Sequence, residues 1–578
     1  MKFSELSNYL EQLEKTSSRI EITKILAELF KKTDKGEIDK TVYLLLGSLG
    51  PSYEGIVFNL AERMMVRVIA KAYSRDAKKV KAIYKKKGDL GDVAASLATG
   101  RGKGLGVAEV YDRLFKVAKD EGEGSQDRKV KAMAKLLSEL DPLSVRFVAR
   151  IPIGKLRLGF SDKTVIDALS WMKKGDKSLR GKLETAYFVL PDVGLLAKKV
   201  KQLGVSKATK DTLPVVGVPV LPMLAQRLKS PAEMIKKMGQ VGVEPKFDGL
   251  RIQIHYRKGP PRLAKARRGE AGFVKAFTRN MNETSWMFPE LAKIGSFISA
   301  SEVILDTEAV GLDEKTRALA NFQTTMTRRR KHEIEETARK IAIKFYVFDI
   351  LFKDGKNFMG KTYIERRKEL AKTVKDSRVF QVVDYQLTKD ASVIAKEMLR
   401  EVKEGLEGII IKRADSRYVP GRTGWRWVKM KEKEKAHAKL ADTIDCVVMG
   451  YSAGRGRRAE FGVGQFLVGV REKDQIKTVT KVGTGLTDEQ FRELKKRLKR
   501  IEVGKKPKEF VVHKNLEPDT WVTPSLVVEI AADEITKSPT HTAGFALRFP
   551  RLIKFRDDKS VNQATTLSEV KRLFKLQN

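Results

Sequence analysis

Apolar side chains in the first two hundred residues recur at the spacing of amphipathic helices. Polar segments that contain glycine, such as residues 85–92 and 99–106, separate these stripes. No fixed period stands out, which argues against a repeat solenoid. We therefore predict an all-α domain over residues 1–212, which ends before a proline-rich segment. The stripes include Phe3, Leu6, Leu10 and Leu13; Ile22, Ile25, Leu26 and Leu29; and Ala132, Leu136, Leu137 and Leu140.

After the proline-rich segment 214–222, the pattern changes to short apolar runs with the composition of β-strands. These runs alternate with charged helical stretches, which predicts a mixed α/β (α+β) domain over residues 213–435. A dense charged run at 429–439 has the composition of a solvated linker. Beyond it, alternating strands predict a small β-barrel over residues 436–578, with five or so strands.

Composition narrows the class of partner. The chain has 578 residues, and 115 Lys+Arg against 73 Asp+Glu give a net charge of +42. A polyanion is the expected partner, with nucleic acid ahead of an anionic membrane. The single cysteine, Cys446, excludes an internal disulfide and a multi-cysteine zinc site. No signal peptide or membrane span is apparent, so we expect a cytoplasmic protein without a membrane partner.

The stretch Glu244-Pro-Lys-Phe-Asp-Gly-Leu-Arg251 suggests covalent chemistry. A lysine is a nucleophile only when its amine loses a proton, and nearby cations or burial favour that loss. Alone, the pattern equally fits a surface lysine beside a turn. Elsewhere in this domain, carboxylates at strand ends could hold Mg²⁺, alternating lysines could grip a triphosphate, and a strand phenylalanine could stack on a base.

Seven motifs follow one another along the chain: EPKFDGLR, FTRN, ILDTEAVG, YVFDIL, GLEGIIIKR, WVKMK and LRFPRLIKFRDDK. In this order they resemble the motifs of ATP-dependent DNA ligases of the archaeal and eukaryotic replicative type. The helical start, including residues 156–169, resembles the DNA-binding domain of that family, and the β-rich end resembles its OB-fold domain. The resemblance covers nearly the whole chain and implies an all-α DNA-binding domain, a nucleotidyltransferase domain and an OB-fold β-barrel.

The resemblance implies a role for each matching residue. Lys246 would be the nucleophile that becomes adenylated, with ATP and Mg²⁺ (or Mn²⁺) as cofactors. Nicked duplex DNA would be the substrate of a monomeric enzyme that acts in replication, repair and recombination. A sliding clamp is a further partner that the family resemblance suggests, although no motif in the chain indicates it. The implied contacts are Glu244 and Phe348 with adenine; Arg251 and Arg279 with ribose and phosphates; Glu308 with ribose or metal; Glu407 with metal; Lys429 and Lys431 with the α-phosphate; and Arg556, Asp558 and Lys559 with pyrophosphate.

The sequence departs from the family pattern in two places. The insertion 258–272 separates the lysine motif from the Thr-Arg-Asn match, so the role of Arg279 rests on that match and not on spacing. Thr423 stands where relatives often have arginine, and we expect Arg422 to replace it, with Arg426 as the alternative.

A second motif competes with the first. Residues 355–362 match the phosphate-loop pattern G-x-x-x-x-G-K-[ST]. Phe358 and Met359 are bulky where a loop must wrap phosphates closely, so we expect an exposed turn with Thr362 as a helix N-cap.

Other functions stay open at this point. An RNA ligase or a capping-type guanylyltransferase would share the lysine chemistry, and a non-catalytic DNA-binding protein would share the charge. The basic segment from Phe491 to Phe510, predicted as a helix, and the run Arg328–Lys331 indicate phosphate contacts without base readout, or simply solvated faces.

Overall fold

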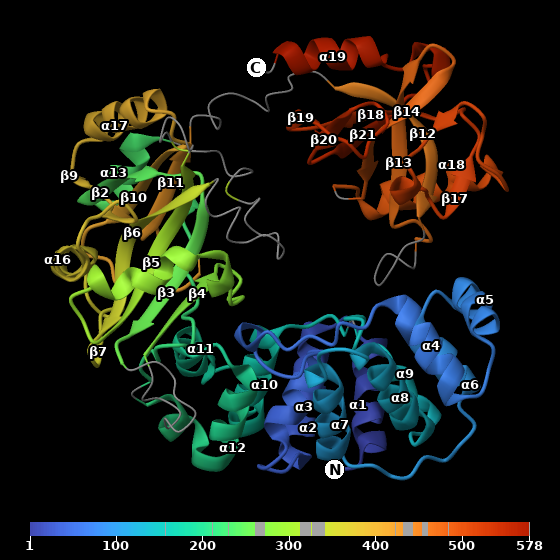
Figure 1. Cartoon of the computed structure of the whole chain (residues 1–578), viewed down its shortest axis with the longest axis horizontal. Coiled ribbons are helices and arrows are strands. Elements are labelled where there is room, and N and C mark those ends of the chain that lie inside the picture. The colour runs from blue at the N-terminus through green and yellow to red at the C-terminus, as the bar shows by residue number, and fades with distance from the viewer. Residues whose placement is uncertain are drawn as a thin grey trace. The chain divides into compact units, whose positions relative to one another are not determined.

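The computed structural model describes residues 1–156, 158–210, 212–228, 230–259, 272–312, 319, 325, 341–421, 424–431, 443–452, 461–483 and 485–576. They form two compact units, Met1–Met430 and Lys431–Asn578 (Figure 1). Within the described residues, no helix is long and apolar enough to cross a membrane. The predicted boundaries at 212/213 and 435/436 stay predictions.

The first part of the chain is helical, as predicted. All four apolar residues of the first stripe, from Phe3 to Leu13, are buried on one helix. The third stripe is partly wrong, because Ala132 is exposed and Met133 takes its place in the core. The helices are α1 (Phe3–Lys15), α2 (Arg19–Lys32), α3 (Ile38–Leu45), α4 (Glu62–Ala72), α5 (Ala77–Lys87), α6 (Leu90–Leu97), α7 (Val107–Lys119), α8 (Ser125–Ser138), α9 (Pro142–Val148), α10 (Asp162–Lys174), α11 (Arg180–Val189) and α12 (Val193–Thr209).

Two small sheets follow in the first unit (Figure 1). The chain passes from one sheet to the other between β2 and β3, through residues 247–249. One sheet has the order β1 (Gln226–Arg227), β11 (Trp427–Lys431), β10 (Gly408–Arg413), β2 (Val241–Lys246) and β9 (Gln386–Thr388). The other has β4 (Phe273–Thr278), β3 (Leu250–Arg257), β5 (Glu302–Leu312), β6 (Ala342–Lys353) and β7 (Lys356–Asn357), with β8 (Phe380–Val382) beside β6.

Each sheet buries one face in its own core. Helices α13 (Pro231–Met238) and α17 (Ala391–Lys403) pack their apolar side chains against β2 and β10. Two short 3₁₀ segments, Ser285–Met287 and Pro289–Ser296, cover β3, β5 and β6. A third helix, α16 (Tyr363–Thr373), contacts β6. The opposite face of each sheet carries the motif residues, and these two faces lie towards each other.

Two buried polar side chains of β3 accept hydrogen bonds from the proline-rich segment. The backbone amide of Gly217 donates to Nδ1 of His255 at 3.1 Å, and the amide of Val220 donates to Oε1 of Gln253 at 2.7 Å. Nε2 of His255 lies 3.0 Å from the same Oε1. His255 therefore accepts at one nitrogen and donates at the other, which requires its neutral form. Burial lowers the pKa of His255 to about 3, and the charge of Lys275 adds to the effect.

We expect the buried His255 to weaken the fold in acid. In the unfolded chain the imidazole has a pKa of about 6.5. Between about pH 6 and pH 4 the unfolded state binds the extra proton, so the free energy of unfolding falls by up to about 1.4 kcal/mol for each unit that the pH falls. Chemical unfolding of the wild type and of His255→Gln at each pH measures this slope. The substitution should flatten it, and His513→Gln in the second unit should not.

The second unit is built on an eight-stranded sheet, so the prediction of five or so strands was too low (Figure 1). Its order is β15 (Glu502–Val503), β17 (Thr520–Val522), β12 (Ile444–Ser452), β13 (Gln465–Glu472), β14 (Gln475–Val482) and β16 (Phe510–Val511), with β18 (Val527–Ala531) joining β12 to β21 (Arg551–Phe555). A hairpin, β19 (Glu534–Lys537) and β20 (Phe545–Arg548), and helices α18 (Asp488–Lys499) and α19 (Leu567–Leu576) complete it. The predicted basic helix to Phe510 was too long, since α18 ends at Lys499.

Candidate active site

Lys246 lies at the end of β2, beside the start of β10. The register pairs Lys246 with Gly408, and the amide of Glu407 donates to the Lys246 carbonyl at 3.2 Å. This pairing brings the Glu407 carboxylate into an ion pair with Nζ of Lys246. Nζ also donates to the carbonyl of Phe247 at 3.2 Å, and the lysine side chain is 19% exposed. The amine is therefore held by the neighbouring strand and is still reachable from solvent.

A second carboxylate acts on the same amine from the other sheet. Glu308 lies in the middle of β5, not at its end as predicted. In the register of the two strands it lies opposite Arg251 of β3. Burial raises the pKa of Glu308 to about 7. The negative charges of Asp306 and Glu407 add to this rise, and the positive charges of Lys246 and Arg251 oppose it. Three carboxylates and two cations from both sheets thus form one electrostatic cluster.

Glu308 and Glu407 are suitable ligands for Mg²⁺. Mg²⁺ is usually bound through one or two carboxylates together with waters and substrate phosphates. In the part of the chain that the structure describes, no three His, Cys, Asp or Glu side chains converge to form a protein-only metal cage. The donor set therefore fits a cation that arrives with a phosphate substrate. A bound cation would also favour the ionised form of Glu308.

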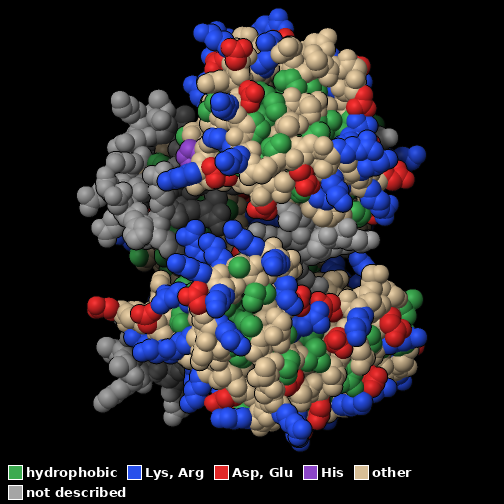
Figure 2. All heavy atoms as spheres, turned by 90° about the vertical axis from the view of Figure 1, so that its right-hand side faces the viewer, with side chains coloured by type: hydrophobic (Ala, Val, Ile, Leu, Met, Phe, Trp, Pro, Cys, Tyr) green, Lys and Arg blue, Asp and Glu red, His purple; other side chains and the backbone are tan. Residues whose placement is uncertain are grey.

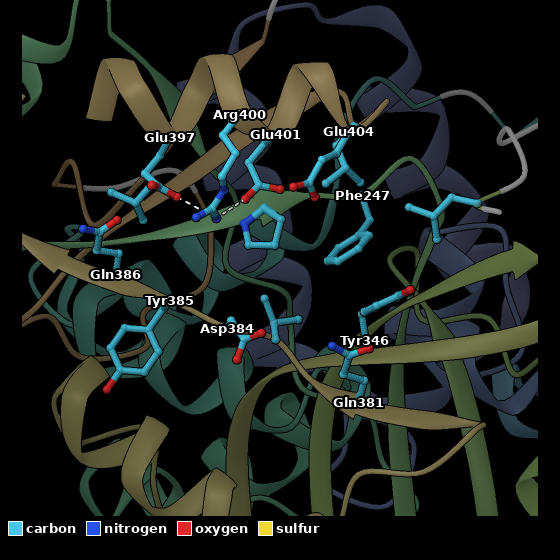
Figure 3. Close-up of a pocket in the computed structure, with 15 residues that line it drawn as sticks. Phe247, Tyr346, Gln381, Asp384, Tyr385, Gln386, Glu397, Arg400, Glu401 and Glu404 are labelled. Atoms are coloured by element: carbon cyan, nitrogen blue, oxygen red, sulfur yellow. Dashed lines mark hydrogen bonds and ion pairs between the residues drawn. The ribbon is translucent and has the colours of Figure 1, made fainter. Parts of the chain in front are cut away.

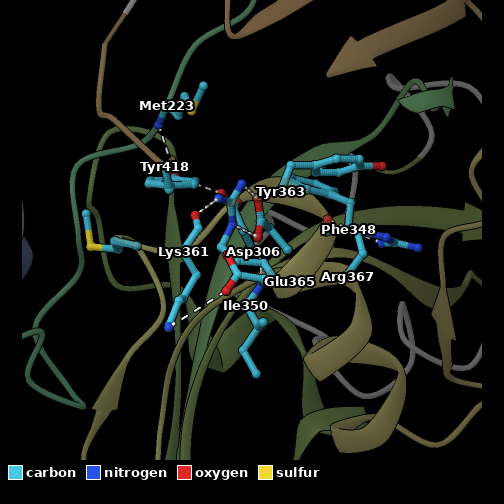
Figure 4. A network of polar contacts seen from close by, with 12 residues as sticks. Met223, Asp306, Phe348, Ile350, Lys361, Tyr363, Glu365, Arg367 and Tyr418 are labelled. Carbon is cyan, nitrogen blue, oxygen red and sulfur yellow. Dashed lines mark hydrogen bonds and ion pairs between the residues drawn. The ribbon is translucent and has the colours of Figure 1, made fainter. Parts of the chain in front are cut away.

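Arg251 is fixed by a residue to which the sequence analysis gave no role. Its Nε and Nη2 donate to the two carboxylate oxygens of Asp306 at 3.0 and 2.6 Å, and Nη1 donates to the Met223 carbonyl at 2.6 Å. The Tyr418 hydroxyl donates to Asp306 at 2.9 Å and accepts from the Met223 amide at 3.0 Å (Figure 4). The guanidinium is thereby held rigidly, and Arg279 lines the same small recess as Arg251 and Asp306.

Glu244 and Phe348 are brought together by a buried lysine. Lys412 of β10 contacts the Glu244 carboxylate at 2.6 Å and donates to the Phe348 carbonyl at 3.3 Å. The hydroxyl of Tyr363 donates to the other Glu244 oxygen at 2.7 Å. Lys412 lies within the quoted motif GLEGIIIKR, but its place after three consecutive isoleucines gave no sign that its amine would be buried.

Two more predicted residues lie on β11, and others lie outside the described residues. Lys429 and Lys431 occupy alternate, half-buried positions on one face of β11, as predicted. Arg422 and the run Arg328–Lys331 lie outside the residues that the structure describes.

The phosphate-loop interpretation of residues 355–362 is wrong. Gly355 forms the turn between β6 and β7, and Met359 is buried. Thr362 caps α16 in a capping box with Glu365, which confirms the expected N-cap. Lys361 lies 3.8 Å from Glu365, and the loop is a hairpin followed by a capped helix.

A hollow of about 390 Å³ lies next to the lysine motif, on the other face of β2 (Figure 3). Val243 and Pro245 line it, and the rings of Phe247 and Tyr346 stack at its wall with centroids 3.9 Å apart. Side chains alternate along a strand, so Glu244 and Lys246 point away from this hollow. It is therefore separate from the lysine cluster.

The predicted pyrophosphate-orienting residues gather around one aspartate of the second unit. Asp445 of β12 accepts from Nη1 of Arg556 at 2.9 Å and from Nζ of Lys559 at 2.6 Å. Arg556 also holds Asp558 and lowers the pKa of that carboxyl to about 2. The sequence analysis missed Asp445, because a carboxylate within the apolar strand IDCVVMG does not by itself indicate a partner.

Comparison with known proteins agrees with this geometry. Family models described as DNA ligase N terminus, ATP dependent DNA ligase domain, and ATP dependent DNA ligase C terminal region match residues 2–170, 222–431 and 459–559. The probable DNA ligase of Dictyoglomus turgidum is 40% identical over 586 residues, and the match covers 100% of this chain and 98% of that protein. The DNA ligase of Pyrobaculum islandicum is 37% identical over 601 residues, with 100% and 99% covered. The solved structure named Pmar-Lig_PreS3 is 19% identical with a TM-score of 0.53, covers 95% of this chain and 99% of its own, and shows a similar fold.

Proposed function

The chain belongs to the ATP-dependent DNA ligases, and we propose that it seals nicks in duplex DNA through a covalent Lys246–AMP intermediate. Nick sealing is the known activity of this family. The proposal rests on the surroundings of the Lys246 amine, where the two sheets meet. The amine forms an ion pair with Glu407 and interacts electrostatically with Glu308.

The reaction proceeds by three displacements at phosphorus. The Lys246 amine attacks the α-phosphorus of ATP, a phosphoramide bond forms, and pyrophosphate leaves. The 5′-phosphate at a nick then attacks the lysine-bound AMP and releases the amine. Finally the 3′-hydroxyl attacks the 5′-phosphorus, the phosphodiester bond forms, and AMP leaves. Covalent catalysis of this kind divides one difficult step into easier ones.

The residues of the cluster have separate tasks in this proposal. Glu407 forms an ion pair with the Lys246 amine and orients it towards the nucleotide. Glu308 and Glu407 would hold Mg²⁺ (or Mn²⁺), which neutralises charge that develops on the phosphates. Lys429 and Lys431 would contact the α-phosphate, and Arg251 and Arg279 the ribose and phosphates.

Base and pyrophosphate contacts complete the proposed assignment. Glu244 would hold adenine by its amino group and Phe348 would stack on its face. In the second unit, Arg556, Asp558 and Lys559 would orient the leaving pyrophosphate. Arg422 keeps its proposed contact with the nucleotide on the motif match alone.

A substrate panel tests the proposed function. The purified full-length chain is given nicked duplex DNA and nicked duplex RNA, each with Mg²⁺ and with ATP, GTP or NAD⁺. We expect sealing of the DNA nick with ATP. Sealing of RNA alone would support an RNA ligase, transfer of GMP to RNA ends would support a guanylyltransferase, and the absence of any adduct on Lys246 would support a non-catalytic DNA-binding protein. Each of these three results contradicts the proposal.

Basic side chains are widespread on the described surface and could contact phosphates. On the face that Figure 2 draws, lysine and arginine side chains are spread over the described surface with acidic side chains among them. Helix α18 places Lys496, Arg497 and Lys499 in its last turn. A ligase must accept most sequences, so we propose that shape and phosphate contacts dominate its binding to DNA.

We expect nick affinity to fall steeply with salt. If about six to ten phosphates are contacted, the affinity should fall by roughly 10³–10⁵-fold between about 50 and 200 mM salt, because each contact releases condensed counterions. Fluorescence anisotropy of a labelled nicked duplex measures this slope, with a second nick of unrelated sequence as the control. An affinity that does not change with salt, or that differs greatly between the two sequences, would refute phosphate-dominated binding.

Finer features of the function are proposals from the family. We propose that the chain acts as a monomer on DNA in replication, repair and recombination, with a sliding clamp as a further partner. We propose a cytoplasmic location, in association with the nucleoid if the source is a prokaryote.

A further inference from the structure

Lys412 is a cation buried in the middle of the nucleotidyltransferase domain. The residue is 1% exposed, and its amine lies 2.6 Å from Glu244, 4.6 Å from the ring centre of Phe348 and 4.5 Å from that of Trp427. A buried lysine costs several kcal/mol unless it is paired. Here one carboxylate, one carbonyl and two ring faces contact the amine, and these contacts fix its position.

Tyr363 holds the other oxygen of the same carboxylate. Its hydroxyl donates to Oε1 of Glu244 at 2.7 Å, and Lys412 contacts Oε2. Tyr363 is 0% exposed and Glu244 is 3% exposed. Gly242 makes room for the tyrosine ring, since a Cβ at that position would lie 2.6 Å from a ring carbon. Strands β2 and β10 and helix α16 therefore converge on one carboxylate and fix its orientation.

This carboxylate lies on the reactive side of β2. Glu244 precedes Lys246 by two positions on the strand, so both side chains point to the same face. Lys412 also contacts the ring and the carbonyl of Phe348. One buried lysine thus positions both groups to which we assign base contacts.

We propose that Lys412 and Tyr363 are positioning residues that set the base selectivity of the nucleotide site, because together they hold Glu244 as a hydrogen-bond acceptor for the amino group of adenine. The inference rests on the proposed function, in which Glu244 contacts the base. An ionised carboxylate only accepts hydrogen bonds. It therefore suits the exocyclic amine of adenine and opposes the carbonyl that hypoxanthine and guanine carry at the same ring position.

Loss of the lysine should weaken this discrimination. Without Lys412, one oxygen of Glu244 would lose the contact that fixes it, and the carboxylate could turn away from the base. A base carbonyl would then no longer face a fixed acceptor. A site that forms a hydrogen bond to one group of its substrate normally prefers that substrate by a large factor to an analogue without the group. We expect the preference for ATP over ITP to become smaller in this variant.

The test compares two triphosphates that differ at one ring position. The full-length chain with Mg²⁺ is given ATP or ITP, and kcat/KM for the nucleotidyl adduct on Lys246 is measured for wild type, Lys412→Met, Tyr363→Phe and Lys353→Met. Lys353 is a matched control, because it pairs with Glu369 at 2.8 Å in the same domain and is 18% exposed. We expect wild type to prefer ATP by at least about 100-fold.

The ratio of the two kcat/KM values decides the inference. Lys412→Met should lower the ATP:ITP ratio at least about tenfold, and Tyr363→Phe about threefold, because each removes one donor to Glu244. Lys353→Met should leave the ratio unchanged. Equal losses with both nucleotides would make Lys412 merely structural and overturn the inference, and if Lys412→Met does not fold, an unchanged ratio in Tyr363→Phe overturns it. A wild-type chain that forms no adduct with either nucleotide would overturn the proposed function as well.

Discussion

Replacement of Lys246 by alanine should abolish sealing with ATP and spare the last chemical step. Without the amine no enzyme–AMP bond can form, so we expect adduct formation to fall by at least about 10⁴-fold. The 3′-hydroxyl, and not the lysine, attacks during the final step, so a nick that already carries 5′-linked AMP should still be joined at a measurable rate. Gel assays of both substrates measure the two activities separately.

Two further variants sharpen this prediction. Lys246→Arg should also form no adduct, because a guanidinium stays protonated and is no nucleophile. Lys361→Ala changes the lysine of the rejected phosphate loop and should leave adduct formation intact. If Lys246→Ala retained the adduct while Lys361→Ala lost it, the assignment of the nucleophile would be wrong.

Replacement of Asp349 by alanine should destabilise the nucleotidyltransferase domain more than any surface change. Asp349 and Arg366 form a two-pronged ion pair at 2.7 and 3.0 Å, and both side chains are 0% exposed. Arg366 also donates to the carbonyls of Lys361 and Ser416 at 2.8 and 3.1 Å. Removing the carboxylate leaves a buried, uncompensated cation, so we expect a loss of about 3–5 kcal/mol in the free energy of unfolding.

The chain offers a matched control for this pair. Arg413 and Asp415 make the same two-pronged contact at 2.6 and 2.9 Å, but their side chains are 39% and 66% exposed. Asp415→Ala should therefore cost less than about 1 kcal/mol. Because a multidomain chain need not unfold in one step, hydrogen exchange of the α16 amides is the suitable measurement. A similar loss in the free energy of unfolding for Asp349→Ala and Asp415→Ala would show that burial does not determine how much such an ion pair contributes.

Secondary-structure elements were predicted from the sequence more accurately than the buried polar contacts between them. The sequence identified the helical start by its periodicity, and the strands that carry Lys246 and Phe348 by their β-rich composition. It placed Glu308 at a strand end, although the strand continues to Leu312, since β5 is buried on both faces and does not alternate. It extended the basic helix to Phe510 because charge alone does not mark where a helix ends.

The positions of the site residues were predicted through motifs, and the contacts between them were not. Lys246 and Glu407 meet because the register of β2 and β10 places them together, and register is set by the whole sheet. Asp306, Lys412 and Asp445 fix motif residues from positions within apolar strands. Their partners lie far away in the sequence, from 55 residues for Asp306 with Arg251 to 168 for Lys412 with Glu244 (412 − 244), and no local pattern indicates such pairs.

Mapping of the adenylated peptide tests the central claim most directly. The full-length chain is incubated with ATP and Mg²⁺ without DNA, digested, and sequenced by mass spectrometry. We predict AMP on Lys246, within the peptide that contains Glu244-Pro-Lys-Phe-Asp-Gly. AMP on another lysine, such as Lys361 or Lys412, or no adduct at all, would contradict the account.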